Sequence, residues 1–516
     1  MVLLAPLIII HRSLKIVTNY SSLVNRIKIS RLINCSQYKD KDKYMKLLWW
    51  GQKHGHTEIA FNNQRTQENT IFESILLSQP NVTLESEKQS IILHIPSTCL
   101  ELGNIDFFTS HQKKVVPPRH SNFRLIQNQK RQESKKTVNL IFIPASLLKI
   151  GNLAFFRSQV KYMIFARNAQ IQFIGPSAFE ETHLNSVQIP PSIEQLGYSI
   201  LYRSEIKSIS FSPTIKLREI PSGAFQSCQQ LSSIEIPASV ERIEGWAFRG
   251  TNLASITFPH NSKLRYISGQ SFDSCKRLTS IEIPASVQVI SGYAFYGSSC
   301  QSITFAPNSQ LETIGIGAFQ NCSNLISLEI PSSVKEIGED AFHDSGFQSI
   351  RFGFNSKLMG IPTTLFYGLS NLTSIEIPSE VEEIGESAFA RSGLKLITFA
   401  PNSRLKTIKK FAFEGCQGLN FVEIPSSVTE IEERAFANSN VKSVVFSPDS
   451  KLRTIRRGAF EGCGLEAIEI PSSVEIIEEA AFENCVQLKS ISASRFKAAK
   501  DQPQCVSSMG QRSLDR

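Results

Sequence analysis

An Ile-Pro dipeptide recurs at a nearly fixed interval along this chain. The step from one such proline to the next is 47 residues five times and 46 residues once. The dipeptides end at Pro190, Pro237, Pro284, Pro331, Pro378, Pro425 and Pro471. A fixed period of this size is typical of a repeat array, in which each unit buries its apolar face against its neighbours and not in one central core.

Each 47-residue period contains two related, shorter coils. In the first, Ser233-Ile234-Glu235-Ile236 alternates polar and apolar residues, which predicts a short strand with one buried face. Pro237 cannot donate a hydrogen bond to a ladder, so the strand ends there. The segment from Ile243 to Phe248 is too short for a long helix. We therefore expect a helical or 3-10 turn that carries Phe248 inward.

The repeated order of residues resembles a known family. Its pattern, L-x-x-I-x-I-P-x-S-V-x-x-I-x-x-x-A-F-x-x-C/S, is similar to the BspA-like leucine-rich repeat of bacterial and protist surface proteins. It runs from about Leu140 to Ile491, and Leu93-His94-Ile95-Pro96 resembles an earlier, degenerate copy. The resemblance implies an α/β solenoid: a right-handed, curved array with short parallel strands on its concave face and helical or 3-10 turns opposite. It also implies adhesion or recognition at a cell surface.

The repeat pattern divides the chain into four parts. Residues 1–87 form a poorly patterned basic N-terminal region, 88–139 a degenerate repeat and linker, 140–492 the solenoid, and 493–516 a polar C-terminal tail. Sixteen strand centres can be counted from Phe142 to Ile491. At roughly 4.8 Å per strand, the stack is on the order of 70 Å long. The number of residues is therefore ample for a continuous core.

The positive charge of the chain is concentrated before the array. Of the 55 Lys+Arg and 46 Asp+Glu residues, 20 and 10 lie in residues 1–140, which leaves 35 against 36 for the rest. Because the array is nearly neutral and the basic runs lack interleaved aromatic residues, we expect no nucleic-acid partner. No apolar run approaches the ~20 residues that span a bilayer, so we expect no integral membrane segment.

The first ten residues are almost entirely apolar. They lack the basic N-terminal segment and the A-x-A-like cleavage site that are typical of a signal peptide. A cleaved signal peptide, a buried first strand and an inaccurate start codon each account for this stretch. The resemblance leads us to expect a cell-surface or secreted protein, with a cytoplasmic location as the alternative.

Five cysteines form a column, each three residues after the closing Phe of its coil: Cys228, Cys275, Cys322, Cys416 and Cys463. Members two coils apart are about 10 Å from each other, beyond the ~7 Å Cα limit of a disulfide, so we expect buried free thiols. Cys485 lies one coil from Cys463, which leaves a disulfide between these two as an open alternative. Asn321 and Asn371 stand in sequons after the Phe and are candidate glycosylation sites.

The strand positions that point away from the core form the candidate partner-binding strip. Glutamate alternates there with mostly neutral residues, beside a second outward column of serines. The strip consists of Glu235, Thr257, Glu282, Thr304, Glu329, Arg351, Glu376, Thr398, Glu423 and Glu469. One interpretation is an extended acidic, hydroxyl-lined surface for a basic or glycosylated partner. The other interpretation is that duplication of the repeat copied solvent-exposed residues that have no role in binding.

Motifs for catalysis are missing from the sequence. It contains no P-loop, no G-x-S-x-G and no H-E-x-x-H, and His54 and His56 lack further spaced metal ligands. We therefore predict no catalytic, cofactor-binding or metal-binding residues. The expected function is non-enzymatic recognition or adhesion by a surface antigen that binds a host-matrix or cell-surface protein. The alternative is an intracellular leucine-rich-repeat scaffold for protein-protein interaction.

Overall fold

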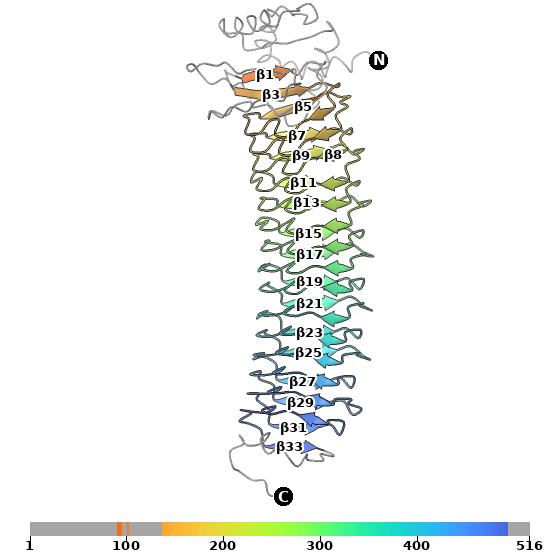
Figure 1. Cartoon of the computed structure of the whole chain (residues 1–516), viewed down its shortest axis with the longest axis vertical. Coiled ribbons are helices and arrows are strands. Elements are labelled where there is room, and N and C mark those ends of the chain that lie inside the picture. Colours follow the sequence, from red (N-terminus) through yellow and green to blue (C-terminus); the bar gives the residue numbers. More distant parts are fainter. Residues whose placement is uncertain (1–89, 95–100, 103–136, 494–516) are drawn as a thin grey trace, which may run out of the picture.

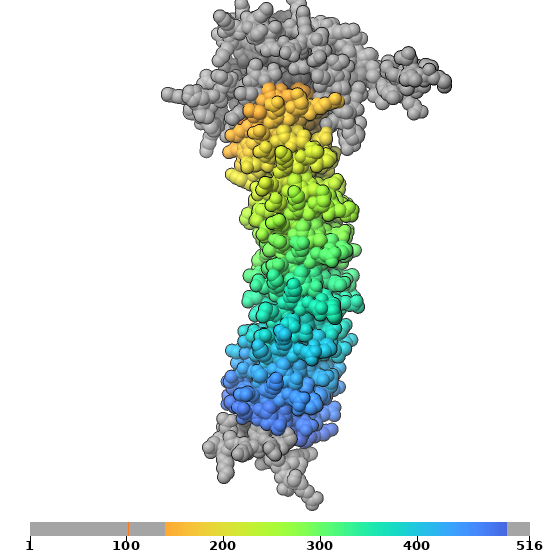
Figure 2. All heavy atoms as spheres, turned by 90° about the vertical axis from the view of Figure 1, so that its right-hand side faces the viewer, coloured from red at the N-terminus to blue at the C-terminus, as the bar shows by residue number. Residues whose placement is uncertain are grey.

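The computed structural model describes residues 90–94, 101–102 and 137–493 of the 516-residue chain. The predicted basic region 1–87 with His54 and His56, and the tail from residue 494 onward, lie outside the described residues. Figure 1 shows the coils stacked in sequence order into one long column, which is close to straight in this view. In Figure 2 the described part forms one continuous rod.

The described residues form 33 strands and no helix, and each coil except the last contributes a longer and a shorter strand. The longer strands are β1 (Ser90–His94), β3 (Thr137–Ile143), β5 (Tyr162–Phe165), β7 (Ser186–Ile189), β9 (Ser208–Phe211), β11 (Ser233–Glu235), β13 (Ser255–Thr257), β15 (Ser280–Ile283), β17 (Ser302–Phe305), β19 (Ser327–Ile330), β21 (Ser349–Phe352), β23 (Ser374–Ile377), β25 (Leu396–Phe399), β27 (Phe421–Ile424), β29 (Ser443–Phe446), β31 (Ala467–Ile470) and β33 (Ser490–Ala493).

The shorter strands have two residues each. They are β2 (Glu101–Leu102), β4 (Lys149–Ile150), β6 (Phe173–Ile174), β8 (Gln195–Leu196), β10 (Glu219–Ile220), β12 (Arg242–Ile243), β14 (Tyr266–Ile267), β16 (Val289–Ile290), β18 (Thr313–Ile314), β20 (Glu336–Ile337), β22 (Gly360–Ile361), β24 (Glu383–Ile384), β26 (Thr407–Ile408), β28 (Glu430–Ile431), β30 (Thr454–Ile455) and β32 (Ile476–Ile477). Longer strands pair with longer strands and shorter with shorter, always in parallel.

Sixteen coils, from β3 to β33, carry the strands that the sequence predicts, each at its expected place. A coil has three sides: the longer strand, the shorter strand, and the turns that lead back to the next longer strand. In β19 the pattern of exposed and buried residues alternates, and Ser327 and Glu329 point outward while Leu328 and Ile330 are buried. The parallel-strand solenoid predicted from the period is therefore confirmed.

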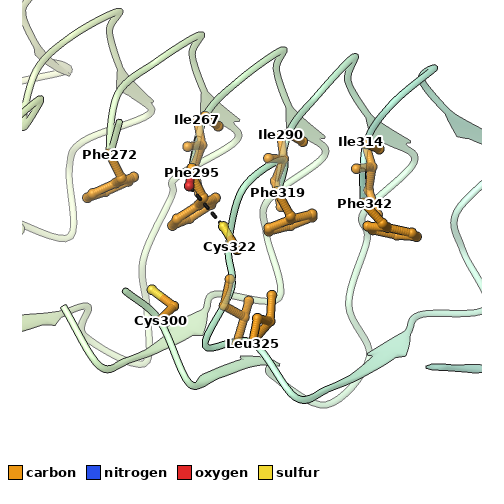
Figure 3. Packing of buried hydrophobic residues seen from close by; sticks show 14 of the residues in the cluster. Ile267, Phe272, Ile290, Phe295, Cys300, Ile314, Phe319, Cys322, Leu325 and Phe342 are labelled. Carbon is orange, nitrogen blue, oxygen red and sulfur yellow. Dashed lines mark hydrogen bonds between the residues drawn. The ribbon is translucent and has the colours of Figure 1, made fainter. Parts of the chain in front are cut away.

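The core is a set of stacked columns, one side chain per coil. An unbroken row of phenylalanines runs from Phe225 to Phe482, with ring centroids 4.8 Å apart at the closest step, Phe366 to Phe389, and 6.0 Å at the widest, Phe319 to Phe342. Figure 3 shows part of this row beside a second row of isoleucines from the shorter strands. Offset-stacked rings contribute about 0.5–1.5 kcal/mol per pair beyond their burial, so the row stabilises every step of the stack.

The segment that closes each coil is not helical, and the predicted helical or 3-10 turn is wrong. The amides of Phe248 and Gly250 donate to carbonyls of the next coil, Ser271 O and Asp273 O, both at 2.8 Å. Trp246 and Gly250 have left-handed φ angles of 58° and 64°. A helix would keep its amides within one segment, whereas here alternate amides are needed to join the coils. The prediction that Phe248 points inward is confirmed, since it is fully buried.

We predict that Phe319→Ala destabilises the array by about 3 to 5 kcal/mol, because it removes a fully buried ring from the stacked row. Glu329→Ala is the matched control in the following strand, where the side chain is exposed. Urea unfolding followed by circular dichroism measures both variants. Equal destabilisation by the two substitutions would contradict the assignment of inner and outer faces.

Candidate partner-binding face

The ten strip residues predicted from the sequence lie on one side of the solenoid, and all ten are exposed. We call them the glutamate strip: Glu235, Thr257, Glu282, Thr304, Glu329, Arg351, Glu376, Thr398, Glu423 and Glu469. Parallel pairing sets Glu235 beside Thr257 and Glu329 beside Arg351. Successive glutamates are thus two coils apart, about 10 Å, which keeps like charges from lying directly opposite one another.

The exposed strip begins only after the first coils. At the corresponding outward positions of β3 and β5, Phe142 is half-buried and Ile164 is 2% exposed, and both belong to a cluster separate from the main core. From β7 onward most outward residues are polar, starting with Gln188. The part of the face that can meet a partner therefore extends from β7 toward the C-terminal coils.

The strip glutamates have no ion-pair partner among the residues that the structure describes. The shorter-strand face differs. There Lys406 Nζ lies 2.6 Å from Glu382 Oε2, and Arg456 lies 2.6 Å from both Glu430 and Glu478. The hydrogen bonds that Arg456 donates to Glu478 and Glu430 raise the pKa of its guanidinium. Several carboxylates of the shorter-strand face near the C-terminal end are thus paired with cations within the molecule, whereas those of the strip are not.

Charges on the shorter-strand face alternate from coil to coil near the C-terminal end, which the sequence analysis missed. The pairs that follow the shorter strands read Lys409-Lys410, Glu432-Glu433, Arg456-Arg457 and Glu478-Glu479. Lys409 Nζ lies 3.3 Å from Glu383 and 3.4 Å from Glu432, in the coils on its two sides. Aligning the coils by sequence would have revealed this alternation, because the pairs recur at the coil interval.

Three apolar residues interrupt the polar longer-strand face, and the sequence analysis did not single them out as a group. Leu396 and Phe421 take the serine position in neighbouring coils and are 47% and 42% exposed. Val445, 44% exposed, stands opposite Glu423 in the next strand. The sequence could have revealed this group, because Leu396 and Phe421 interrupt the column of serines. Exposed apolar residues within a polar rim are typical of a protein-protein contact.

The cysteine column is buried as predicted, and its thiols are free. Each donates to a carbonyl of the preceding coil; Cys322 Sγ lies 3.0 Å from Phe295 O, the bond drawn in Figure 3. Burial raises the pKa of Cys228 and Cys275 to about 12. Such thiols are protonated at neutral pH and unreactive.

Cys463 and Cys485 are also free thiols in this structure, each with its own carbonyl acceptor, Phe436 O and Phe460 O. The disulfide between them stays a prediction. Asn371 is exposed, whereas Asn321 is half-buried with a left-handed φ of 60°. Glycosylation at these two residues likewise stays a prediction.

The described residues contain no cluster of three or more side chains suited to hold a metal ion. Within the same ranges, no helix is long and apolar enough to cross a bilayer. What the described surface offers is a long, regular strand face with unpaired carboxylates and one apolar interruption.

The fold defines a leucine-rich-repeat solenoid, and comparison with known proteins identifies its family. The model of the BspA type leucine rich repeat region matches with six copies over residues 148–263, 248–360 and 359–489. The chain therefore belongs to the BspA-type leucine-rich-repeat family, which is a repeat scaffold. The resemblance seen in the sequence is confirmed. No curated protein matches the chain.

Several solved structures are similar to the chain at low identity. A leucine-rich repeat protein from Bacteroides ovatus is 20% identical, with 69% of this chain and 84% of that chain covered and a TM-score of 0.42. A leucine rich cell surface protein from Faecalibacterium prausnitzii is 22% identical, with 70% and 81% covered and a TM-score of 0.27. At these scores neither likeness carries an argument about function.

We predict that the column cysteines of the reduced protein resist alkylation at pH 8, whereas Cys485, which is only half-buried, reacts first. The cause is burial, which raises the pKa of Cys228, Cys275 and Cys463 to about 12. Iodoacetamide labelling with peptide mass spectrometry measures this. Fast labelling of Cys275 in the folded protein would contradict the assigned packing.

The same shifts predict a loss of stability at high pH. Because the folded pKa is raised above the unfolded value, this contribution is complete below about pH 9 and is lost as pH rises toward 12, where unfolded thiols ionise and buried ones do not. Urea unfolding between pH 8 and 11 measures it. Serine replacement of Cys228 and Cys275 should flatten the decline; an unchanged slope would count against this cause.

Proposed function

We propose that this chain is a non-enzymatic recognition protein, surface-associated or secreted, that binds another protein through the glutamate strip. The observation that carries the proposal is the contrast between the two sheets. Glutamates in or beside the shorter strands, such as Glu382 and Glu430, form ion pairs with cationic side chains, whereas the strip glutamates form no ion pair among the described residues. Unpaired carboxylates at a regular spacing complement a Lys- or Arg-rich protein segment.

The apolar break in the serine column, beside the glutamate strip, gives this contact an apolar anchor. Leu396 and Phe421 lie in adjacent coils, and Glu376 and Glu423 stand beside them on the same face. Apolar contacts at the centre of an interface contribute most of the affinity, while charges around them steer association and set specificity. A partner segment with an apolar side chain between basic residues fits this part of the strip. A host-matrix or cell-surface protein is the kind of partner that the family suggests.

An intracellular scaffold is the second candidate, and one observation favours it. All seven cysteines of the described part are free, including the neighbours Cys463 and Cys485. Free thiols in this number are usual for a reducing compartment. Their burial makes them compatible with an oxidising one as well, because a buried protonated thiol is inert.

We predict that reversing Glu282, Glu329 and Glu376 to Lys abolishes binding to a basic probe, because it replaces three unpaired carboxylates with cations. The probe is a fluorescent 20-residue polylysine, measured by anisotropy at low and physiological salt. The matched control reverses Glu194, Glu219 and Glu336, exposed residues outside the strip, and has the same net charge. Equal losses in the two triple variants would mean that only overall charge matters, and would discard the strip.

The location of the protein separates the two candidates. We predict that a C-terminal tag is accessible on intact, unpermeabilised cells or is found in the culture medium. Detection with an antibody and a glycosidase-sensitive mass shift, mapped to Asn321 or Asn371, measures this. A purely internal, unglycosylated product would replace surface recognition with the scaffold as the proposed function.

A further inference from the structure

The turn side of the solenoid, away from the glutamate strip, carries a concentration of aromatic and planar polar side chains. Three successive coils contribute two neighbouring columns, which we call the flank patch: Trp246, Gln270 and Tyr293 in one, and Arg249, Asp273 and Tyr296 in the other. Tyr293 and Tyr296 show that the columns touch, since their ring centroids are 5.9 Å apart at 70°. Further along the first column stand Asp340, Thr364 and Ser387, and the next aromatic residue of the column is Phe411, several coils away.

The two aromatic rings of the first column are held against the next coil and remain open to solvent. Trp246 is 44% exposed, and its Nε1 donates to Gln270 Oε1 at 2.5 Å. Tyr293 is 37% exposed and lies across Gly317, where an added Cβ would collide with its ring atoms Cδ1 and Cε1. Both residues have a φ of 58°, and their amides donate to Gly269 O and Ile316 O of the next coil. The backbone beneath the rings is therefore fixed before any ligand arrives.

Polar groups lie beside the rings. Arg249 Nε is 2.9 Å from Asp273 Oδ2, and the Asp273 side chain is only 4% exposed. Asp273 also accepts a hydrogen bond from Ser274 Oγ at 2.6 Å. Gln270 accepts the Trp246 hydrogen bond through its side-chain oxygen. Its side-chain nitrogen, Nε2, has no hydrogen-bond partner among the described residues. The patch thus combines partly exposed aromatic rings with a nearly neutral set of hydrogen-bonding groups.

We propose that the flank patch binds a linear, uncharged oligosaccharide that runs along the solenoid axis. Sugar rings stack their C–H faces on aromatic side chains, while amides, guanidinium groups and carboxylates bind their hydroxyls. Trp246 and Tyr293 are two coils apart, about 10 Å. In an extended β-1,4-linked chain, alternate sugars present the same face at a similar repeat. Gln270, in the coil between the rings, meets the intervening sugar.

The test uses the full chain with cellohexaose and chitohexaose as probes, measured by isothermal titration calorimetry. We expect binding of at least one probe, a loss of affinity of about tenfold or more in Trp246→Ala and in Tyr293→Ala, and recovery in Trp246→Phe. Tyr198→Ala, which removes an aromatic residue that is 61% exposed outside the patch, is expected to leave the affinity unchanged. Thermal unfolding of each variant checks that the coils remain folded.

Several outcomes would overturn the proposal. They are no heat of binding with either probe, equal weakening by Tyr198→Ala, and unchanged affinity in folded Trp246→Ala. The Glu282, Glu329 and Glu376 reversal is expected to keep full oligosaccharide affinity, since it lies on another side of the coil. Failure of the glutamate strip and failure of the flank patch are therefore distinguished by the same set of proteins.

Discussion

The hydrogen bonds that join each coil to the next set the geometry on which the rest of this protein depends. Both strands of a coil pair in parallel with those of its neighbours, and alternate amides of the closing turn, such as that of Phe248, bridge to the following coil. This bonding holds equivalent residues at one coil spacing throughout. Any side chain that recurs in the repeat must therefore tolerate a near copy of itself directly above and below.

Apolar and charged residues meet that condition in different ways. Phenylalanine gains from stacking, and the row from Phe225 to Phe482 is unbroken. Charged residues would repel if stacked, and the two sheets avoid this differently. The strip separates its glutamates with neutral residues such as Thr257, whereas the C-terminal shorter strands alternate acidic and basic coils through residues such as Lys409. Only the first arrangement leaves charge available to a partner.

Departures from the repeat are the best indicators of recognition on such a regular surface. Duplication explains a column of identical serines, but it does not explain Leu396 and Phe421 in that column, or Trp246 and Tyr293 together on the turn side. These side chains are between 37% and 47% exposed, so the fold buries them only in part. They lie on two different sides of the coil, so the rod offers two separate places for contact.

The sequence by itself determined the repeat, the inward and outward strand positions and the burial of Phe248 and Cys275, because each follows from a period of two within a coil and of 47 between coils. Only the tertiary structure decided how the closing turn is built. Alternate amides of this turn donate to carbonyls of the next coil. The spacing of residues within the turn does not reveal these bonds. The tertiary structure likewise decided which carboxylates form ion pairs. Glu430 pairs with a cation because the stacking of the coils brings Arg456 within reach.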